Sequence, residues 1–167
     1  RLIVIRDRPH LARGAHNIIP ESGGFDVAET LDLIKFWPRP TFFFAPTMVT
    51  RLINAPNINQ SDISNLKTIV YGGAPMYLND TLKALEILGP KLVQIYGQGE
   101  SPMTITGLPK HILNNKKHPN YFERLSSVGI ARTDVEIRIV SDNGEPKDIG
   151  EVGEIIVRGD VVMKGYW

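Results

Sequence analysis

A short polar segment of this chain combines a carboxylate, an aromatic ring and two glycines. The segment is Gln94–Glu100, and it directly follows the short run Lys91–Val93. A strand through this run would deliver the ring of Tyr96 and the carboxylate of Glu100 to one edge of a sheet. Because a carboxylate binds a hard cation and a flat ring offers a stacking surface, such an edge suits a magnesium nucleotide.

A turn of small residues occurs about twenty positions earlier in the chain. The strand expected at Thr68–Tyr71 ends in Gly72–Pro75, whose sequence is Gly-Gly-Ala-Pro. Such a turn is too small to block a flat ligand that lies against its backbone. We therefore expect the two strand ends to line one pocket.

A third block completes an ordered set of motifs. It comprises Gly150–Gly159 and, shortly after it, Val162–Trp167. Over nearly its whole length the chain resembles the adenylate-forming family, the AMP-forming acyl-CoA synthetases, which carry three such blocks in this order. The resemblance implies a ligase that activates a carboxylate with MgATP as an acyl-adenylate and then passes the acyl group to CoA. It therefore implies ATP/AMP and Mg²⁺ as cofactors and CoA as co-substrate.

The resemblance also implies roles for individual residues. Glu100 matches the catalytic glutamate associated with the metal, and Tyr96 matches the tyrosine that lies against the adenine. The other positions expected to bind the nucleotide are Gly73, Ala74, Pro75, Gln94, Ile95, Gly97 and Gly99. The substrate pocket is expected to include Gly72, Gly73 and Gln98.

One position departs from the family pattern. Most members carry threonine directly before the glutamate, and its hydroxyl contacts the α-phosphate, whereas this chain has Gly99. Backbone N–H groups of Gly97 and Gly99, or a water molecule, could replace that donor. Weaker nucleotide binding or altered chemistry are the other interpretations.

Several family motifs are not recognisable in the chain. These are the phosphate loop ending in Pro-Lys-Gly, the Thr-Gly-Asp segment for the ribose and the lid domain with its lysine. The segment Ile5–Pro9, before His10, also lacks the pattern expected to guard the acyl pocket. We therefore expect a central fragment of the large N-terminal domain, inactive by itself. The alternative is a non-catalytic remnant or interaction module of the same fold.

The elements that must position these motifs alternate between strand and helix. A helix is predicted from Asp26, with Glu29 completing a capping box, to about Phe36, and Gly89 ends a later helix whose leucines share one face. The remaining predicted elements are a short strand at 17–19, strands at 41–45, 68–71 and 103–106, and a helix from Pro46 through Ile53. This alternation predicts an α/β fold, with a partly parallel sheet flanked by helices over residues 15–106.

The remainder of the chain has a different pattern. Val135–Val140 alternates with period two, Asp142–Gly144 supplies a hairpin turn, and Glu154–Arg158 is the expected partner strand. These features predict a small antiparallel β subdomain at 128–167. The predicted division is therefore 1–106, a connection at 107–127 and 128–167, with Lys110–Asn120 interpreted as an exposed loop.

Composition places limits on partners and location. The chain has 167 residues, 42% of them hydrophobic, a formal net charge of +1 and no cysteine. The small charge does not indicate nucleic-acid binding, and the lack of cysteine excludes disulfides and thiolate metal sites. With no apolar span or signal peptide, we expect a soluble cytoplasmic protein. A medium- or long-chain fatty acid is the favoured carboxylate because the pocket side is apolar and carries no obvious charged selector. A fragment would also expose apolar surface that its missing segments normally cover, so we expect self-association.

Other catalytic patterns are not satisfied. Gly97–Pro102 begins like a dinucleotide fingerprint, but Pro102 replaces the third glycine and a strand-like run follows, which disfavours a dehydrogenase. No Gly-x-Ser-x-Gly elbow surrounds Ser101. Metal-ligand spacing is absent among the histidines, which are His10, His16, His111 and His118.

Overall fold

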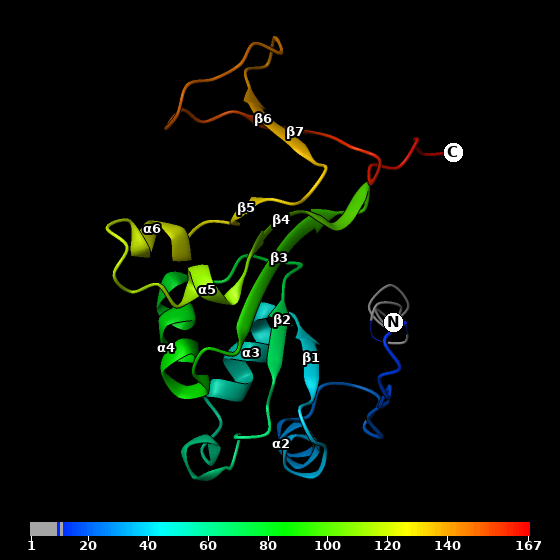
Figure 1. Ribbon diagram of the computed structural model, residues 1–167, viewed down its shortest axis with the longest axis vertical. Helices are drawn as coiled ribbons and strands as arrows, with labels where there is room; N and C mark the ends of the chain where they lie inside the picture. Colours follow the sequence, from blue (N-terminus) through cyan, green and yellow to red (C-terminus); the bar gives the residue numbers. More distant parts are fainter. Residues whose placement is uncertain (1–9, 11) are drawn as a thin grey trace.

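The computed structural model describes residue 10 and residues 12–167, so the segment Ile5–Pro9 lies outside the described residues. Figure 1 shows a body of helices and strands at one end of the molecule and a two-stranded ribbon at the other. The elements are α2 (Val27–Phe36), β1 (Thr41–Phe44), α3 (Pro46–Ile53), η1 (Ile58–Gln60), β2 (Thr68–Tyr71), α4 (Leu78–Leu88), β3 (Leu92–Gln98), β4 (Ser101–Leu108), α5 (Lys110–Leu113), α6 (Tyr121–Leu125), β5 (Ile130–Ala131), β6 (Glu136–Val140) and β7 (Glu154–Arg158). Among the helices of this described part, none combines the length and apolarity that a membrane crossing requires.

The larger sheet is mixed, with five strands in the order β1-β2-β3-β4-β5. The first three strands are parallel, and β4 and β5 each run antiparallel to the preceding strand. Helix α3 connects β1 to β2, and α4 connects β2 to β3, as parallel neighbours require. The predicted α/β class is therefore confirmed, and so is the small antiparallel sheet, formed by β6 and β7. The carboxyl ends of β2 and β3 lie at one edge.

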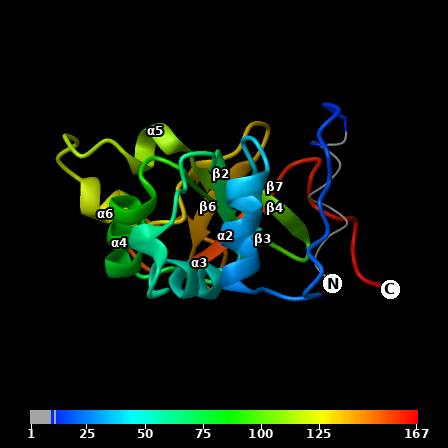
Figure 2. The ribbon, with the colours of Figure 1, turned by 90° about the horizontal axis from the view of Figure 1, so that it is seen from below.

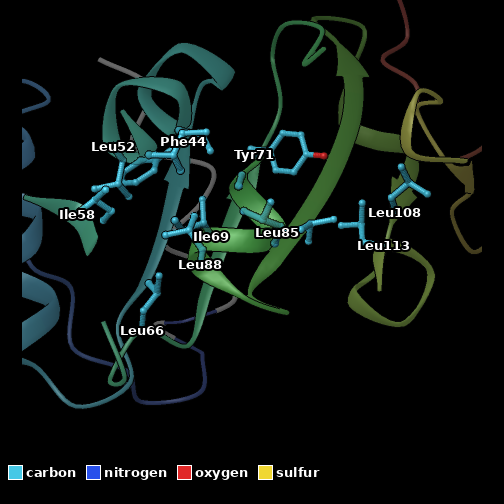
Figure 3. Close-up of a cluster of buried hydrophobic side chains, with 14 of the residues drawn as sticks. Phe44, Leu52, Ile58, Leu66, Ile69, Tyr71, Leu85, Leu88, Leu108 and Leu113 are labelled. Atoms are coloured by element: carbon cyan, nitrogen blue, oxygen red, sulfur yellow. The ribbon is translucent and has the colours of Figure 1, made fainter. Parts of the chain in front are cut away.

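The buried core lies on one face of the larger sheet. Residues paired in register share a face, and the face that carries Phe44, Ile69, Tyr71 and Leu92 is buried. Figure 3 shows side chains from these strands gathered with those of α3 and α4 in one cluster. The opposite face carries side chains that are only half-buried, namely Phe43, Val70 and Val93. The helices therefore cover one face more fully than the other.

Helix α2 begins as its sequence predicts, with one difference. The Asp26 carboxylate accepts a hydrogen bond from the backbone N–H of Glu29 at 2.8 Å. The Glu29 carboxylate does not return to the cap, because it accepts from the backbone N–H of Glu21 at 2.7 Å and from Ser22. Half of the predicted capping box thus forms, and Glu29 instead ties the preceding loop to the helix.

Two local predictions are wrong. No strand forms at Asn17–Ile19, where the chain is exposed and pairs with no strand of the described sheets. The segment Lys110–Asn120 is not wholly an exposed loop, because α5 occupies its start and Leu113 is fully buried. Tyr121 and Leu125, which follow on α6, are also buried. Apolar contacts to the α/β body fold this connection into two short helices.

The ribbon is connected to the sheet through a short strand. β5 pairs with β4, so Ile130 and Ala131 belong to the larger sheet. Beyond it, Glu136 pairs with Arg158 and Val140 with Glu154 in the β6–β7 ribbon. The predicted turn forms, with the Gly144 N–H donating to the Ser141 carbonyl at 2.8 Å. The division of the chain into domains stays a prediction.

Candidate functional site

The two predicted motifs meet where the end of β2 lies against β3. Tyr71 pairs with Gln94, and Gly72 follows directly. A Cβ atom added to Gly72 would lie 2.4 Å from the carbonyl oxygen of Ile95. Only glycine allows this approach of two backbones. The structure therefore brings the two motifs together, as their positions at strand ends predict.

A buried polar pair lies beneath this edge. The Tyr71 side chain is 1% exposed and Gln94 is 8% exposed. The Tyr71 hydroxyl donates to Gln94 Oε1 over a long 3.4 Å. Burial raises the pKa of Tyr71 to about 12, so the hydroxyl remains a neutral donor. The side-chain amide of Gln94 thus faces the core through its oxygen, Oε1.

The surface of the first turn is open. Gly73, Ala74 and Pro75 are all exposed. Gly73 has φ +88°, a left-handed conformation that favours glycine, and no atom lies within 4 Å of a Cβ built there. A flat ligand can therefore approach this turn closely, as the sequence predicts for the nucleotide.

The turn between β3 and β4, which carries Gly99 and Glu100, is shaped by an irregularity in β4. Tyr96 pairs with Thr106 and Gln98 with Ser101, so the extra residues of β4 bulge opposite Gly97. A Cβ atom on Gly97 would lie 2.1 Å from the backbone nitrogen of Met103. Met103 has φ +60°, an uncommon conformation for a residue with a side chain. The bulge therefore requires glycine at position 97, and it determines the direction of the tip that carries Glu100.

The aromatic ring predicted to lie against the base is half-buried on β3. The hydroxyl of Tyr96 accepts a hydrogen bond from Gln98 Nε2 at 3.0 Å. Ile95, on the opposite face of the strand, is also half-buried. Part of each side chain is therefore accessible to a ligand at this edge.

Glu100 has a partner that the sequence did not indicate. The Tyr166 hydroxyl donates to Glu100 Oε1, and the Met163 N–H donates to the Glu100 carbonyl at 2.8 Å. The Tyr166 hydrogen bond lowers the pKa of Glu100, and the same contact raises the pKa of Tyr166. Tyr166 belongs to the third sequence block, but no local pattern could show that it meets a residue 66 positions away.

The site has room at the position that departs from the family pattern. A Cβ atom on Gly99 would meet only the Tyr166 hydroxyl, at an ordinary contact distance of 3.6 Å. The backbone of Gly99 lies outside the left-handed region. The Cβ atom of a threonine at position 99 would therefore fit without straining the backbone.

The donor set is consistent with magnesium held mainly by phosphates. Within the described residues, no group of three or more His, Cys, Asp or Glu side chains could form a metal cage. Glu100 offers a partly exposed carboxylate with Oε1 bonded to Tyr166. Mg²⁺ prefers oxygen ligands and commonly combines one or two carboxylates with substrate phosphates. A single carboxylate at this edge fits that mode.

Two surface hollows lie away from this edge. One of about 450 Å³ lies between η1 and α4, lined by Ile58 and Lys83 among others. The other, of about 520 Å³, is on the ribbon beside Glu136 and Arg158. Neither is lined by a residue of the two motifs. The candidate site at the strand edge therefore rests on its chemistry and backbone geometry.

Comparisons with known proteins show which family the chain is similar to. The family model described as "AMP-binding enzyme" matches residues 9–167. The medium/long-chain-fatty-acid–CoA ligase FadD8 of Mycobacterium tuberculosis is 32% identical over 95% of this chain and 26% of its own length. A feruloyl-CoA synthase of Amycolatopsis is 31% identical over 95% of this chain and 30% of its own length.

The fold is also similar to that of a solved enzyme. The amide bond synthetase McbA from Marinactinospora thermotolerans superposes with a TM-score of 0.75 at 32% identity. The match covers 87% of this chain and 28% of that enzyme. The chain thus spans between a quarter and a third of the length of these relatives.

Proposed function

The chain belongs to the family of AMP-binding enzymes, and from this premise we propose that it is the nucleotide-binding part of an ATP-dependent, AMP-forming acyl-CoA synthetase. The complete enzyme would activate a carboxylate as an acyl-adenylate and transfer the acyl group to CoA. The observation that carries the proposal is the junction of the two motifs, where Gly72 lies against the Ile95 carbonyl. This junction is followed along β3 by the turn to β4, which carries the Glu100 carboxylate.

Each part of the edge has a task in this reaction. The exposed turn Gly73–Pro75 and the ring of Tyr96 would hold the adenine between small backbone groups and an aromatic surface. Gln94 and Ile95 would line the same base, while Gly97 and Gly99 would lie near the phosphates. Gly72 and Gln98 would border the acyl pocket. Holding both reactants here would lower the entropic cost of their encounter.

Glu100 would hold the metal that the reaction needs. When bound, Mg²⁺ would neutralise the charge that builds up between the attacking carboxylate and the triphosphate. Glu100 would position that ion through its carboxylate at the tip of the β3–β4 hairpin. Without a threonine hydroxyl at position 99, the backbone N–H groups of Gly97 and Gly99 would donate to the phosphates.

The proposal also names the carboxylic acid that is activated and the acceptor of the acyl group. The matched ligases include one named for medium- and long-chain fatty acids and one for feruloyl groups. We favour a fatty acid, because the half-buried side chains Val93 and Ile95 offer aliphatic surface near the edge. CoA is the favoured acyl acceptor because the names of both relatives contain CoA. A cytoplasmic location and self-association of the 167-residue chain complete the proposal.

The decisive experiment changes Glu100 to Gln in the complete enzyme that contains this chain. Pyrophosphate release that depends on fatty acid should collapse, because the amide keeps the shape and removes the charge that holds Mg²⁺. Thioester formation from a pre-made acyl-adenylate should suffer much less, since it does not need that metal. Glu123→Gln, the same change at an exposed position on α6, is the matched control.

The 167-residue chain alone should release no pyrophosphate from ATP in the presence of fatty acid. Pyrophosphate release that depends on added fatty acid would contradict the assignment of the remaining catalytic groups to other segments. The competing function is a non-catalytic remnant or interaction module of the same fold. A complete protein that binds ATP but neither adenylates nor thioesterifies any carboxylate would favour that alternative.

A further inference from the structure

The segment after the ribbon folds back onto the carboxylate at the β3–β4 turn. The Met163 N–H donates to the Glu100 carbonyl at 2.8 Å, and the Tyr166 hydroxyl donates to the Glu100 carboxylate. Figure 1 shows the C-terminal segment beside the tip of the β3–β4 hairpin. Figure 2 shows the same segment at the opposite end of the molecule from α4 and α6. The contact is therefore specific to the edge that carries the motifs.

The Tyr166 hydroxyl is a neutral hydrogen-bond donor to the Glu100 carboxylate. Among the described residues the ion pairs are Lys147 with Glu151 and Arg158 with Glu136, so no cation there offsets the charge of Glu100. The Tyr166 side chain is 77% exposed, so its ring is not part of the core. The hydroxyl also lies 3.6 Å from the position of a Cβ on Gly99, beside the turn itself. Its contribution comes from the hydrogen bond and not from apolar packing.

We propose that Tyr166 is a positioning residue for Glu100, fixing one carboxylate oxygen while leaving the other available to Mg²⁺. The inference rests on the proposed function, in which Glu100 holds that ion. A phenol suits the task because a neutral donor orients a carboxylate without cancelling its charge. A lysine or arginine at the same place would pair with the carboxylate and compete with the metal.

The contact itself can be tested without activity. Tyrosine labelled with ¹³C at Cζ gives one resonance for each of the five tyrosines of the 167-residue chain. The Tyr166 resonance is identified by its loss in Tyr166→Phe. Glu100→Gln should shift it, because the acceptor loses its charge, while Glu123→Gln should leave it in place. A Tyr166 resonance that does not move in Glu100→Gln would overturn the proposal.

The positioning role is tested in the complete enzyme with Tyr166→Phe. The Mg²⁺ concentration for half-maximal pyrophosphate release should rise about tenfold, the factor expected for a hydrogen bond to a charged group. The KM for the fatty acid should not change. Tyr77→Phe is the matched control, because Tyr77 is 76% exposed and Tyr166 is 77% exposed. The double variant Glu100→Gln/Tyr166→Phe should be no worse than Glu100→Gln, since Tyr166 acts through Glu100.

The outcomes separate the two proposals. An unchanged magnesium requirement in Tyr166→Phe, in an enzyme that Glu100→Gln inactivates, would overturn the positioning role and leave the proposed function intact. A parent rate in Glu100→Gln would overturn the metal role of Glu100, and the positioning role would fail with it. A tenfold shift in Tyr166→Phe together with the shifted resonance would support both.

Discussion

The larger sheet and the β6–β7 ribbon are held by different forces. The hydrophobic core cluster draws its buried side chains from the sheet, its helices and their connections, whereas Val140 is the buried hydrophobic residue that the ribbon contributes. Ile155 and Ile156 of β7 are each 43% exposed. A two-stranded sheet without a packed face is marginally stable in water. The nucleotide edge is thus built on a rigid support, while the segment bearing Tyr166 depends on pairing and a few polar contacts.

The largest test of this comparison truncates one isoleucine in each region. Ile69 is fully buried on β2, so Ile69→Ala should lower the free energy of unfolding by about 2–5 kcal/mol. Ile155→Ala on the ribbon should lower it by less than about 1 kcal/mol. Urea unfolding followed by circular dichroism measures both, and Ile69→Val provides a milder change at the same site. Equal losses at the two positions would contradict a core confined to the sheet.

The second test uses the buried hydroxyl beneath the edge. The folded chain raises the pKa of Tyr71 to about 12 from an ordinary 10.0, because the side chain is buried. As pH rises above 10 the unfolded chain loses this proton first, so stability should fall by about 2–3 kcal/mol up to pH 12. Tyr71→Phe should remove this part of the decline. Parallel pH profiles of unfolding for the parent and Tyr71→Phe would show that the hydroxyl is not buried as described.

The sequence predicts best what neighbouring residues determine. Asp26 and Gly89 mark helix ends through local capping, and both helices form where expected. The short helices at 110–125 were missed because they depend on the burial of Leu113 and Tyr121, which distant elements provide. The spacing of Tyr121 and Leu125 was the available signal. The Glu100–Tyr166 contact had no local signal, because chain folding alone brings these residues together.

The third test compares two glycines of the same turn. Gly97→Ala should lower the free energy of unfolding by about 1–3 kcal/mol, because its Cβ would lie 2.1 Å from the Met103 nitrogen. Gly99→Ala should be neutral or stabilise by a few tenths of a kcal/mol, since space is available and the unfolded chain loses freedom. Thermal unfolding of the pair measures the difference. A destabilisation of the same size in Gly99→Ala would show that the tip of the hairpin is as tightly packed as the bulge opposite Gly97.

The smallest effect concerns the ion pair that joins the two strands of the ribbon. Glu136 faces Arg158 in register, and the Arg158 guanidinium donates to both carboxylate oxygens, at 2.6 and 2.7 Å. This hydrogen bonding, together with the positive charge, lowers the pKa of Glu136 below its usual 4.5. The pair therefore stabilises the ribbon above pH 4.5 and loses that effect as pH falls through the lowered pKa. Both side chains are exposed, so the contribution is small and screened by salt.

Hydrogen exchange of the β6 and β7 amides, compared between the parent and Glu136→Gln at each pH, measures this contribution. The two proteins should differ at neutral pH and low salt, and the difference should vanish in acid as Glu136 takes up its proton. The amides of β1, β2 and β3 should exchange alike in both proteins, because packing and not this pair holds the larger sheet. A difference that spread equally to β2 would mean that the ribbon and the sheet open as one unit, and the contrast between the two regions would then be wrong.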